Sequence, residues 1–253
     1  RGHRVWATAR RLESIADLES HGCKLLRLDV TDRASMEAAV SAIETSDGVV
    51  DVLVNNAGYG LQGAAETTNI DDVRAQFETN LFGPVALTQL VLPKMRRQRW
   101  GRIVNISSMG GKITLPGGAY YHATKHALEA FSDVLRFEVR PFGVDVIVIE
   151  PGLIKTRFGD AATETLADTE GPYAEFDRAV GRTVEGAYSG PMALAAVGPE
   201  PVAKTIATAI ESTHPRTRYV VPARTRGILW LRRLATDRMW DRAMRVQYPP
   251  PKP

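Results

Sequence analysis

The sequence predicts an α/β fold in which a doubly wound parallel sheet lies between two layers of helices. Short apolar and β-branched runs alternate with longer segments of helical periodicity, which is typical of consecutive βαβ units. Two runs, residues 49–54 and 144–149, are apolar at nearly every position, as expected for strands covered by helices on both faces. With 253 residues, 44% of them hydrophobic, the chain is large enough for one core. We therefore expect a single domain spanning residues 1–253.

The predicted elements alternate in order along the chain. The strand candidates are short runs rich in Val, Ile and Leu: Arg4–Ala9, Lys24–Val30, Val49–Asn55, Arg102–Ser107, Val144–Ile149 and Arg218–Pro222. The helix candidates repeat apolar residues every three or four positions: Glu13–Ser20, Arg33–Thr45, Asp71–Arg99, Ala119–Val139 and Pro201–Thr213. Ligands of such a sheet bind beyond the carboxyl ends of its strands. Those ends are Arg10, Asp29, Asn55–Gly58, Ser107–Ser108 and Pro151–Gly152.

The composition argues against several other classes of protein. The net charge is +3, and the charged residues form no long block of one sign, so the sequence does not indicate nucleic-acid binding. Cys23 is the single cysteine, which excludes an internal disulfide framework and fits a reducing compartment. The histidines lack metal-ligand spacing, and no apolar run is long enough to span a membrane. We expect a soluble, cytoplasmic protein without a metal site.

Two residues of one predicted helix can exchange a proton with a substrate. Tyr121 and Lys125 are four positions apart, so their side chains share a helix face. An ammonium beside a phenol favours the ionised phenol and moves its pKa from about 10 toward neutral pH. Ser108 ends the preceding strand candidate and can donate a hydrogen bond to a substrate oxygen. The Tyr-x-x-x-Lys spacing alone is weak evidence, because it arises by chance in roughly one such chain in five.

The first two strand ends bear on the identity of a nucleotide. Arg10 and Arg11 follow the first strand, where a dinucleotide fold often places an acidic residue for a ribose hydroxyl. A guanidinium can pair with a 2′-phosphate through two hydrogen bonds, so the sequence favours NADP(H) over NAD(H). Two solvated surface arginines are the alternative interpretation. Asp29 can accept from an adenine amino group, or it can cap the helix that begins near Thr31.

Together these motifs resemble the short-chain dehydrogenase/reductase family in its single-domain, Rossmann-like form. The resemblance covers nearly the whole chain and rests on motifs in family order: Asn55-Asn56-Ala57-Gly58, Asn80 within 78–83, Ser108, Tyr121-x-x-x-Lys125, and Pro151-Gly152 through Thr156. The segments Ser108–Gly111, Leu115-Pro116 and Val5–Thr8 resemble the hydroxysteroid and retinol dehydrogenase branch in particular. By analogy, this branch implies a steroid-like, retinoid-like or lipid-like substrate.

The resemblance assigns a role to each of these residues. It implies that Tyr121 is the catalytic acid/base, that Lys125 lowers its pKa and holds the nicotinamide ribose, and that Ser108 orients the substrate oxygen. Asn80 would hold a water of the proton relay. Contacts with the dinucleotide are implied for Asp29, Val30, Asn55, Ala57, Gly58, Tyr121, Lys125, Pro151, Gly152 and Thr156. The resemblance also implies a homo-oligomer, formed through the helices that hold Asn80 and Tyr121.

One motif of the family is absent from the sequence. The family's Thr-Gly-x-x-x-Gly-x-Gly loop receives the pyrophosphate at a helix N-terminus, and nothing like it precedes Arg1. We therefore expect that the sequence begins inside the first βαβ unit of a longer protein, without the first strand and this loop. The absence supports an alternative function, a non-catalytic dinucleotide-binding or scaffold homologue. An epimerase of the extended branch also shares the Tyr-x-x-x-Lys pair, but its strand-end motif differs from Asn55–Gly58.

The remaining segments bear on the substrate and on partners. Residues 157–198 scatter large apolar side chains among Ala, Gly and Thr, so we expect an irregular lid that selects a hydrophobic alcohol or ketone. Residues 224–253 combine apolar and basic residues at helical spacing before a Pro-rich tail. This pattern is typical of a helix in weak peripheral contact with a membrane. It is equally typical of a helix that covers the pocket or a subunit interface. His122 points off the Tyr121 face, so we expect a structural role for it.

Overall fold

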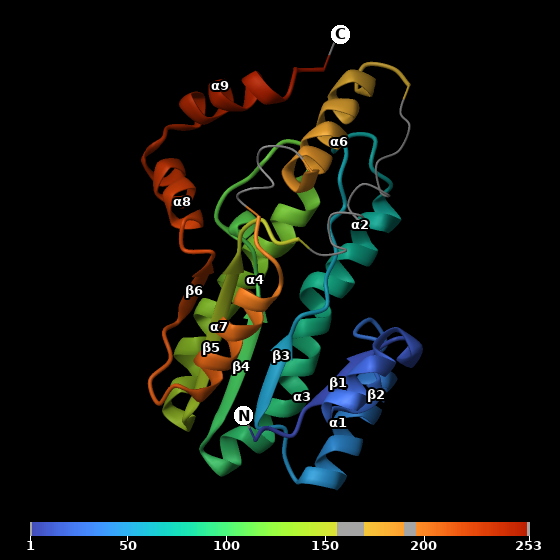
Figure 1. Ribbon diagram of the computed structural model, residues 1–253, viewed down its shortest axis with the longest axis vertical. Helices are drawn as coiled ribbons and strands as arrows, with labels where there is room; N and C mark the ends of the chain where they lie inside the picture. The colour runs from blue at the N-terminus through green and yellow to red at the C-terminus, as the bar shows by residue number, and fades with distance from the viewer. Residues whose placement is uncertain (1, 156–169, 190–195, 252–253) are drawn as a thin grey trace.

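The strands of the predicted fold are present, and every pair of them is parallel. The structure is a computed structural model that describes residues 2–155, 170–189 and 196–251. Its strands are β1 (Trp6–Ala9), β2 (Lys24–Arg27), β3 (Val52–Asn55), β4 (Gly101–Ile106), β5 (Val144–Pro151) and β6 (Arg218–Val221). Each overlaps a predicted run, and the hydrogen-bonded neighbours all run in the same direction. The α/β fold predicted from the sequence is confirmed (Figure 1).

The sheet is interrupted in its middle. β3, β4, β5 and β6 form one four-stranded sheet in that order, and β1 pairs with β2 in a separate two-stranded sheet. β1 lies nearer to β3 than β2 does, so the interruption lies between β1 and β3 (Figure 1). On β3, Val54 is 39% exposed.

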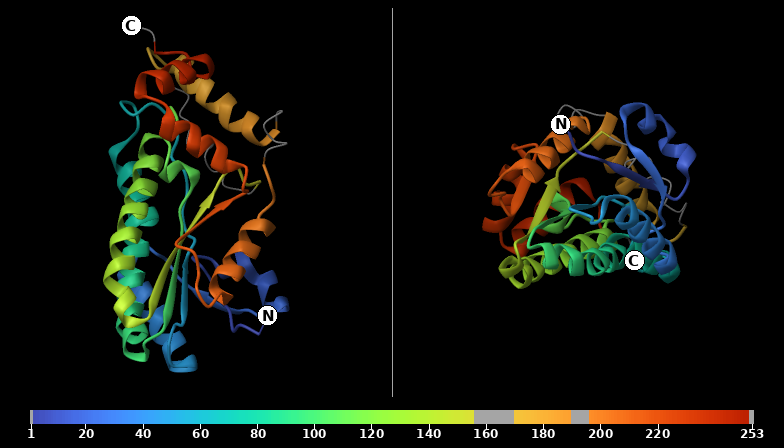
Figure 2. Two further views of the ribbon diagram at one scale, coloured as in Figure 1. Left: turned by 90° about the vertical axis from the view of Figure 1, so that its left-hand side faces the viewer. Right: turned by 90° about the horizontal axis from the view of Figure 1, so that it is seen from below.

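Helices cover both faces of the four-stranded sheet. The helices of the described residues are α1 (Arg33–Asp47), α2 (Ile70–Phe77), α3 (Gly83–Gln98), α4 (Ala119–Val139), α6 (Ala174–Ser189), α7 (Glu200–Glu211), α8 (Thr225–Leu234) and α9 (Asp237–Gln247), with 3-10 or π-helical segments η1 (Leu12–His21), η2 (Glu78–Phe82), η3 (Met109–Gly111) and η4 (Arg140–Phe142). Figure 2 shows α3 and α4 on one face and α7 on the other. The apolar cluster on the first face includes Met95, Ile103 and Val146, and the cluster on the second includes Ile147 and Ala209. Two separate cores thus produce the three layers.

Polar side chains define several helix ends. Asp32 accepts from the backbone N–H of Ala34 and starts α1. Asn69 accepts from the N–H of Asp71 and starts α2. These are ordinary N-caps, which satisfy donors that a helix cannot pair internally. Because Asp32 caps α1, the interpretation of Asp29 as that cap is wrong.

The predicted helix over 71–99 is divided by η2, a π-helical turn. Pro84 is at the start of α3 and lacks the N–H that would donate to the carbonyl of Asn80 in an unbroken α-helix. The helical register therefore changes at η2, and Asn80 lies at the change. A proline within a periodic segment thus explains the difference from the predicted continuous helix.

The predicted lid is only partly irregular. Residues 174–189 form α6, so the expectation of an irregular segment is wrong there. One face of α6 lines the pocket with Val180, Thr183 and Val184, which follow helical spacing. Val180 is 1% exposed. Residues 156–169 and 190–195, which complete most of the predicted lid, lie outside the described residues. The C-terminal segment forms α8 and α9, in agreement with its predicted helical pattern.

Candidate active site

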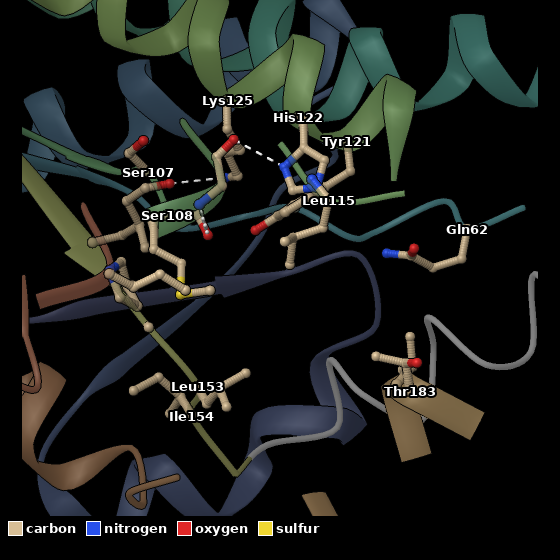
Figure 3. A pocket seen from close by; sticks show the side chains of 18 of the residues that line it. Gln62, Ser107, Ser108, Leu115, Tyr121, His122, Lys125, Leu153, Ile154 and Thr183 are labelled. Atoms are coloured by element: carbon tan, nitrogen blue, oxygen red, sulfur yellow. Dashed lines mark hydrogen bonds between the residues drawn. The ribbon is translucent and has the colours of Figure 1, made fainter. Parts of the chain in front are cut away.

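A pocket of about 520 Å³ lies at the carboxyl ends of β4 and β5. Ser107 and Ser108 follow β4, Tyr121 and Lys125 come from α4, and the segment 151–154 follows β5. Side chains of α6, α7, α8 and α9 complete the lining, and most of them are apolar. Figure 3 shows Ser108 and Tyr121 on one side of the pocket and Leu153 and Ile154 on the other. The sheet therefore places its strand ends where the sequence predicts a ligand.

Lys125 is buried beside Tyr121, its partner one turn earlier on α4. The Lys125 Nζ lies 5.9 Å from the centre of the Tyr121 ring and donates to the carbonyl of Ile106 at 2.8 Å. Burial lowers the pKa of Lys125 from 10.5 to about 8, and the nearby Glu129 carboxylate opposes this effect. The amine is therefore still mostly protonated at pH 7. The charged amine therefore lies next to the Tyr121 ring, as the spacing predicts.

The two serines after β4 have different surroundings. Ser108 Oγ accepts from the N–H of Gly110 at 3.0 Å and caps η3. That bond uses its oxygen, so its hydroxyl proton can still be donated into the pocket. Ser107 is 3% exposed and presses against Gly111, where an added Cβ would lie 2.7 Å from the Ser107 Oγ. Because Ser107 is confined by this backbone, the geometry favours Ser108 as the donor to a substrate oxygen.

Asn80 joins the loop after β3 to α4. Its side-chain N–H groups donate to the carbonyl of Tyr59 at 2.9 Å and to Thr124 Oγ1 at 3.2 Å. Its Oδ1 accepts from the N–H of Tyr59 at 3.1 Å. This amide is thus committed to protein partners, and it holds the loop against the helix that carries Lys125. Asn80 is fully buried and does not line the pocket, and its role in holding a water stays a prediction.

Gly58 packs closely against Asn80 and beside the charged amine. A Cβ built on Gly58 would lie 3.1 Å from Asn80 Oδ1 and 3.6 Å from Lys125 Nζ. A side chain here would crowd Asn80, so glycine allows the loop after β3 to approach Asn80 and Lys125 this closely. Asn56 also lines the pocket, and Ala57 between them is exposed. The loop 56–58 therefore fits the predicted contact with a dinucleotide.

Asn55, which the family resemblance also places along the dinucleotide, is a structural residue here. Its side chain is buried and donates to Asn105 Oδ1 at 2.8 Å, and Asn105 donates to Ser132 Oγ at 2.9 Å. This chain of hydrogen bonds ties β3 to β4 and to α4. These bonds give the Asn55 side chain a structural role, and the contact of Asn55 with a dinucleotide stays a prediction.

The residues expected to bind adenosine lie at the ends of β1 and β2. Asp29 Oδ1 accepts from the N–H and the hydroxyl of Thr31 at 2.9 and 2.7 Å, and these bonds are the main reason why the pKa of Asp29 is lowered. Arg10 is exposed, and its charge contributes to the same lowering. Val30 packs against Gly83 at the start of α3. None of Arg10, Asp29 and Val30 lines the pocket of the catalytic residues.

The end of β5 contributes Pro151 and Gly152 to the pocket. Gly152 packs so closely against Thr225 of α8 that a Cβ would collide with the threonine side chain. This contact brings the C-terminal helices to the pocket. Thr156, the remaining predicted contact of this segment, lies outside the described residues.

His122 lines the pocket, which sequence reasoning missed. Its Nε2 accepts from the N–H of Leu115 at 3.1 Å, so its Nδ1 is the donor to the carbonyl of Gly110 at 3.0 Å. Burial lowers its pKa, which favours this neutral form. Its ring meets the Tyr121 ring edge to face at 5.6 Å. The predicted structural role fits these bonds, because His122 fixes the loop before α4. The sequence does not show that His122 lines the pocket, because this depends on the path of the loop before α4.

Two further polar residues, Gln62 and Thr183, line the pocket from a loop and from α6 (Figure 3). No sequence signal pointed to either, because neither segment has a motif. Among the residues that the structure describes, no group of His, Cys, Asp and Glu is arranged to hold a metal ion.

Comparison with known proteins agrees with this geometry. A family model described as short chain dehydrogenase matches residues 1–167. The chain belongs to the short-chain dehydrogenase/reductase family. This confirms the family predicted from the order of the motifs, and members of this oxidoreductase family act on CH–OH groups.

Three relatives illustrate the range of this oxidoreductase family. The short-chain type dehydrogenase/reductase VdlC of Helicobacter pylori is 31% identical over 97% of this chain and 89% of its own length. The 3-ketodihydrosphingosine reductase of Bacteroides thetaiotaomicron is 41% identical, over 63% of this chain and 58% of its own length. A serine dehydrogenase, solved in its closed form with NADP⁺, is 29% identical to this chain, with a TM-score of 0.74. The match covers 87% of this chain and 85% of the chain of the serine dehydrogenase.

Proposed function

We propose that this protein is an NADP(H)-dependent oxidoreductase that interconverts a hydrophobic alcohol with its ketone or aldehyde. The observation that carries the proposal is the grouping of Tyr121, Lys125 and Ser108 at one side of a largely apolar pocket. A phenol beside an ammonium is suited to acid/base work near neutral pH. A hydroxyl donor from a separate strand end can polarise the same substrate oxygen.

Each of these residues has a distinct task in carbonyl reduction. Ser108 donates a hydrogen bond to the carbonyl oxygen and fixes its position. Tyr121 donates its proton to that oxygen as negative charge develops on it. Lys125 lowers the cost of the resulting phenolate through its buried charge. In the oxidative direction, Tyr121 accepts the proton from the alcohol. When bound, the nicotinamide supplies or accepts the hydride.

The described residues fit the nicotinamide half of the cofactor. The ammonium of Lys125 carries three donors, so it can bond a ribose hydroxyl while it keeps its bond to Ile106. Asn56 and Gly58 line the pocket beside this amine, and Pro151 and Gly152 line it at the end of β5. The Thr-Gly-x-x-x-Gly-x-Gly motif is not in the printed sequence, and we assign no residue to the pyrophosphate. The NADP⁺ complex of the similar serine dehydrogenase supports a nicotinamide dinucleotide.

The substrate class follows from the lining of the pocket. Leu115, Leu153, Ile154, Val180 and Ile206 face the space next to Tyr121. Burial of apolar surface against such walls contributes about 25 cal/mol per Å², which favours an extended hydrocarbon or ring system over a phosphorylated sugar. The long-chain substrate named for the sphingosine-type relative agrees with this interpretation. The steroid-like and retinoid-like compounds of the resembling branch are further members of the same class.

Substitution of Tyr121 tests the catalytic assignment. We expect Tyr121→Phe to lower kcat by about 10²–10⁴-fold while cofactor affinity stays within about threefold, because only the hydroxyl is removed. Activity would be measured with NADPH and NADH against long-chain ketones, hydroxysteroids and retinoids. Tyr120→Phe is the matched control, since the Tyr120 hydroxyl donates to the carbonyl of Ala65 and does not line the pocket. Equal activity of the two variants would refute the acid/base role of Tyr121.

The NADP(H) preference rests on Arg10. A lost charge-assisted hydrogen bond costs about 1.5–3 kcal/mol, so we expect Arg10→Glu to raise KM for NADPH roughly ten- to a hundredfold. KM for NADH should change little. Arg97→Glu, an equal change of charge at the exposed end of α3, is the control. A parallel change for both cofactors would show that Arg10 does not contact a 2′-phosphate.

The second candidate is a non-catalytic dinucleotide-binding or scaffold protein. Cofactor titration by nicotinamide fluorescence separates the two. If the protein is an enzyme, it should bind the cofactor and turn over at least one compound of the substrate series. If it is a scaffold, it should bind the cofactor without any turnover.

The exposed face of α4 supports a homo-oligomer. Val134 and Phe137, one turn apart, are 59% and 81% exposed, and Phe82 of the adjacent η2 is 51% exposed. Apolar side chains gathered on one helix face are typical of subunit contacts. Light scattering should give a mass that is a multiple of 27.7 kDa, and Phe137→Ser should reduce this mass.

We also propose that the assembly is cytoplasmic.

A further inference from the structure

The last two helices form a fixed pair over the pocket. Ile228 of α8 and Met244 of α9 line it, and so does Tyr248, which follows α9. Trp240 is 7% exposed, and its Nε1 donates to the carbonyl of Thr114 at 3.1 Å. Arg232 joins the two helices, because it bonds Asp237 at 2.7 Å and lies 5.5 Å over the Trp240 ring. The inner faces of α8 and α9 are therefore part of the pocket wall. Figure 1 shows where the two helices lie in the fold.

The outer faces of the same helices expose large apolar side chains. On α8, Trp230, Leu231 and Leu234 are 61%, 62% and 76% exposed. On α9, Met239 and Val246 are 62% and 89% exposed, and their separation of seven positions places them on one face. Soluble proteins scatter such side chains singly, whereas a group of them marks an interaction surface. Each helix thus has one apolar face toward the pocket and a second one toward solvent.

Arginines border these exposed apolar residues. The segment 224–247 holds seven arginines and two aspartates, a net charge of +5, although the whole chain carries only +3. The basic excess of the protein is therefore concentrated in these two helices. On α9, Arg238, Arg242 and Arg245 recur at helical spacing next to the stripe of Met239 and Val246. On α8, Arg233 lies 5.8 Å over the exposed Trp230 ring.

We propose that the outer faces of α8 and α9 bind the surface of a bilayer that contains anionic lipids. The apolar side chains would enter the headgroup region, and the arginines would pair with lipid phosphates. The contact is peripheral, because no helix within the described ranges is long and apolar enough to cross a membrane.

The charge distribution favours this partner over two others. A second copy of the chain would place the same +5 surface against itself, which Coulomb repulsion opposes. Nucleic acid would neutralise the arginines but would leave Leu231, Leu234 and Val246 in water. An anionic bilayer accommodates both kinds of side chain. If the proposed function holds, an apolar substrate dissolved in the bilayer is then next to the helices that line the pocket.

Vesicle co-sedimentation tests the proposal with the purified protein. We expect at least tenfold tighter binding to vesicles of phosphatidylcholine mixed with phosphatidylglycerol than to phosphatidylcholine alone, and weaker binding as salt is raised. Trp230→Ser/Leu234→Ser and Arg238→Glu/Arg242→Glu should each weaken binding to the mixed vesicles tenfold or more. Ile70→Ser and Arg97→Glu, which change an exposed apolar residue and an exposed arginine elsewhere, should bind as the parent does. Circular dichroism verifies that each variant is folded.

Specific outcomes would overturn the proposal. Equal binding to the two kinds of vesicle would do so, and so would α8 and α9 variants that bind as tightly as the controls. A surface used for self-association would appear as a lower mass of these variants in sedimentation velocity, with vesicle binding unchanged. The test is independent of catalysis, because Tyr121→Phe should still bind vesicles. The α8 and α9 variants should likewise keep their activity on a small, water-soluble ketone.

Discussion

At the scale of single residues, Lys125 shows a group kept at a cost to stability. Its amine is buried, and its pKa of about 8 lies below 10.5, the value for an exposed lysine. The folded protein therefore places a charge where solvation is poor, next to the ring of Tyr121. Such a residue in a pocket is typical of a functional site. If the proposed function holds, the cost and the function have the same origin, because poor solvation also strengthens the effect of an ammonium on a neighbouring phenol.

Replacement of Lys125 should separate stability from activity. Between about pH 8 and pH 10.5 the unfolded chain binds more protons at this residue than the folded one, so stability rises with pH across this window. Below pH 8 burial of the charged Lys125 amine lowers the free energy of unfolding by its full amount, at most about 3 kcal/mol. We expect Lys125→Met to be more stable than the parent at pH 7 by about 1–3 kcal/mol, by less at pH 10, and inactive. Urea unfolding at both pH values measures this, and a variant less stable at pH 7 contradicts it.

At the scale of elements, close backbone contacts decide how helices meet strands. Gly83 starts α3, and a Cβ there would lie 2.6 Å from the carbonyl oxygen of Val30 and 3.2 Å from that of Glu78. Both atoms belong to the backbone and cannot rotate away. This glycine therefore sets the distance between η2, which holds Asn80, and the loop after β2.

Two glycine substitutions should have opposite effects on stability. Gly83→Ala should destabilise the protein by about 1–3 kcal/mol, because the new methyl group overpacks the contact with Val30. It should also lower activity, since Asn80 would move. Gly186 lies within α6 and has nothing within 4 Å of an added Cβ, so Gly186→Ala should stabilise by about 0.5–1 kcal/mol. Thermal unfolding measures both changes, and a neutral Gly83→Ala would contradict the contact.

At the scale of the whole molecule, a buried group of charges joins α4, β5 and β6. Glu129 accepts from Lys112 at 2.8 Å and from Arg218 at 3.0 Å, and Arg218 also bonds Asp133. Glu150 lies 3.2 Å from the same guanidinium. Burial, and then the neighbouring Glu129, raise the pKa of Glu150 to about 7. One proton is thus retained inside the folded protein at mildly acidic pH.

Replacement of the Glu150 carboxyl group by an amide should make the stability of the protein less dependent on pH. Between about pH 4.5 and pH 7 the folded protein binds more protons at Glu150 than the unfolded chain, so parent stability falls as pH rises through this range. We expect Glu150→Gln to match the parent at pH 5 and to exceed it at pH 8 by about 1–3 kcal/mol. Glu37→Gln, on the exposed face of α1, is the control and should show less than about 0.5 kcal/mol at either pH. Urea titrations would contradict the prediction if the Glu150→Gln variant and the parent differed equally at both pH values.

The sequence by itself determined the alternation of strands and helices and the family, and it indicated Tyr121, Lys125 and Ser108 as candidates for the proposed proton chemistry. Periodicity and composition act over neighbouring residues, so β5 and α4 could be predicted almost to their ends. The spacing of Tyr121 and Lys125 on one helix likewise predicted their shared face. Only the tertiary structure decided what lies opposite them. His122, Gln62 and Thr183 reach the pocket through the paths of loops and the docking of α6.

Tertiary contacts also decided how the predicted site residues are bonded. Asn55 ends a strand as predicted, but its amide pairs with Asn105 of the neighbouring strand, which no local pattern reveals. The same holds for α8 and α9. Their amphipathic pattern was compatible with a pocket cover or with a membrane surface, because periodicity shows that a face is apolar and not what it contacts. Packing showed that these helices have both an inner apolar face against the pocket and an outer one in solvent.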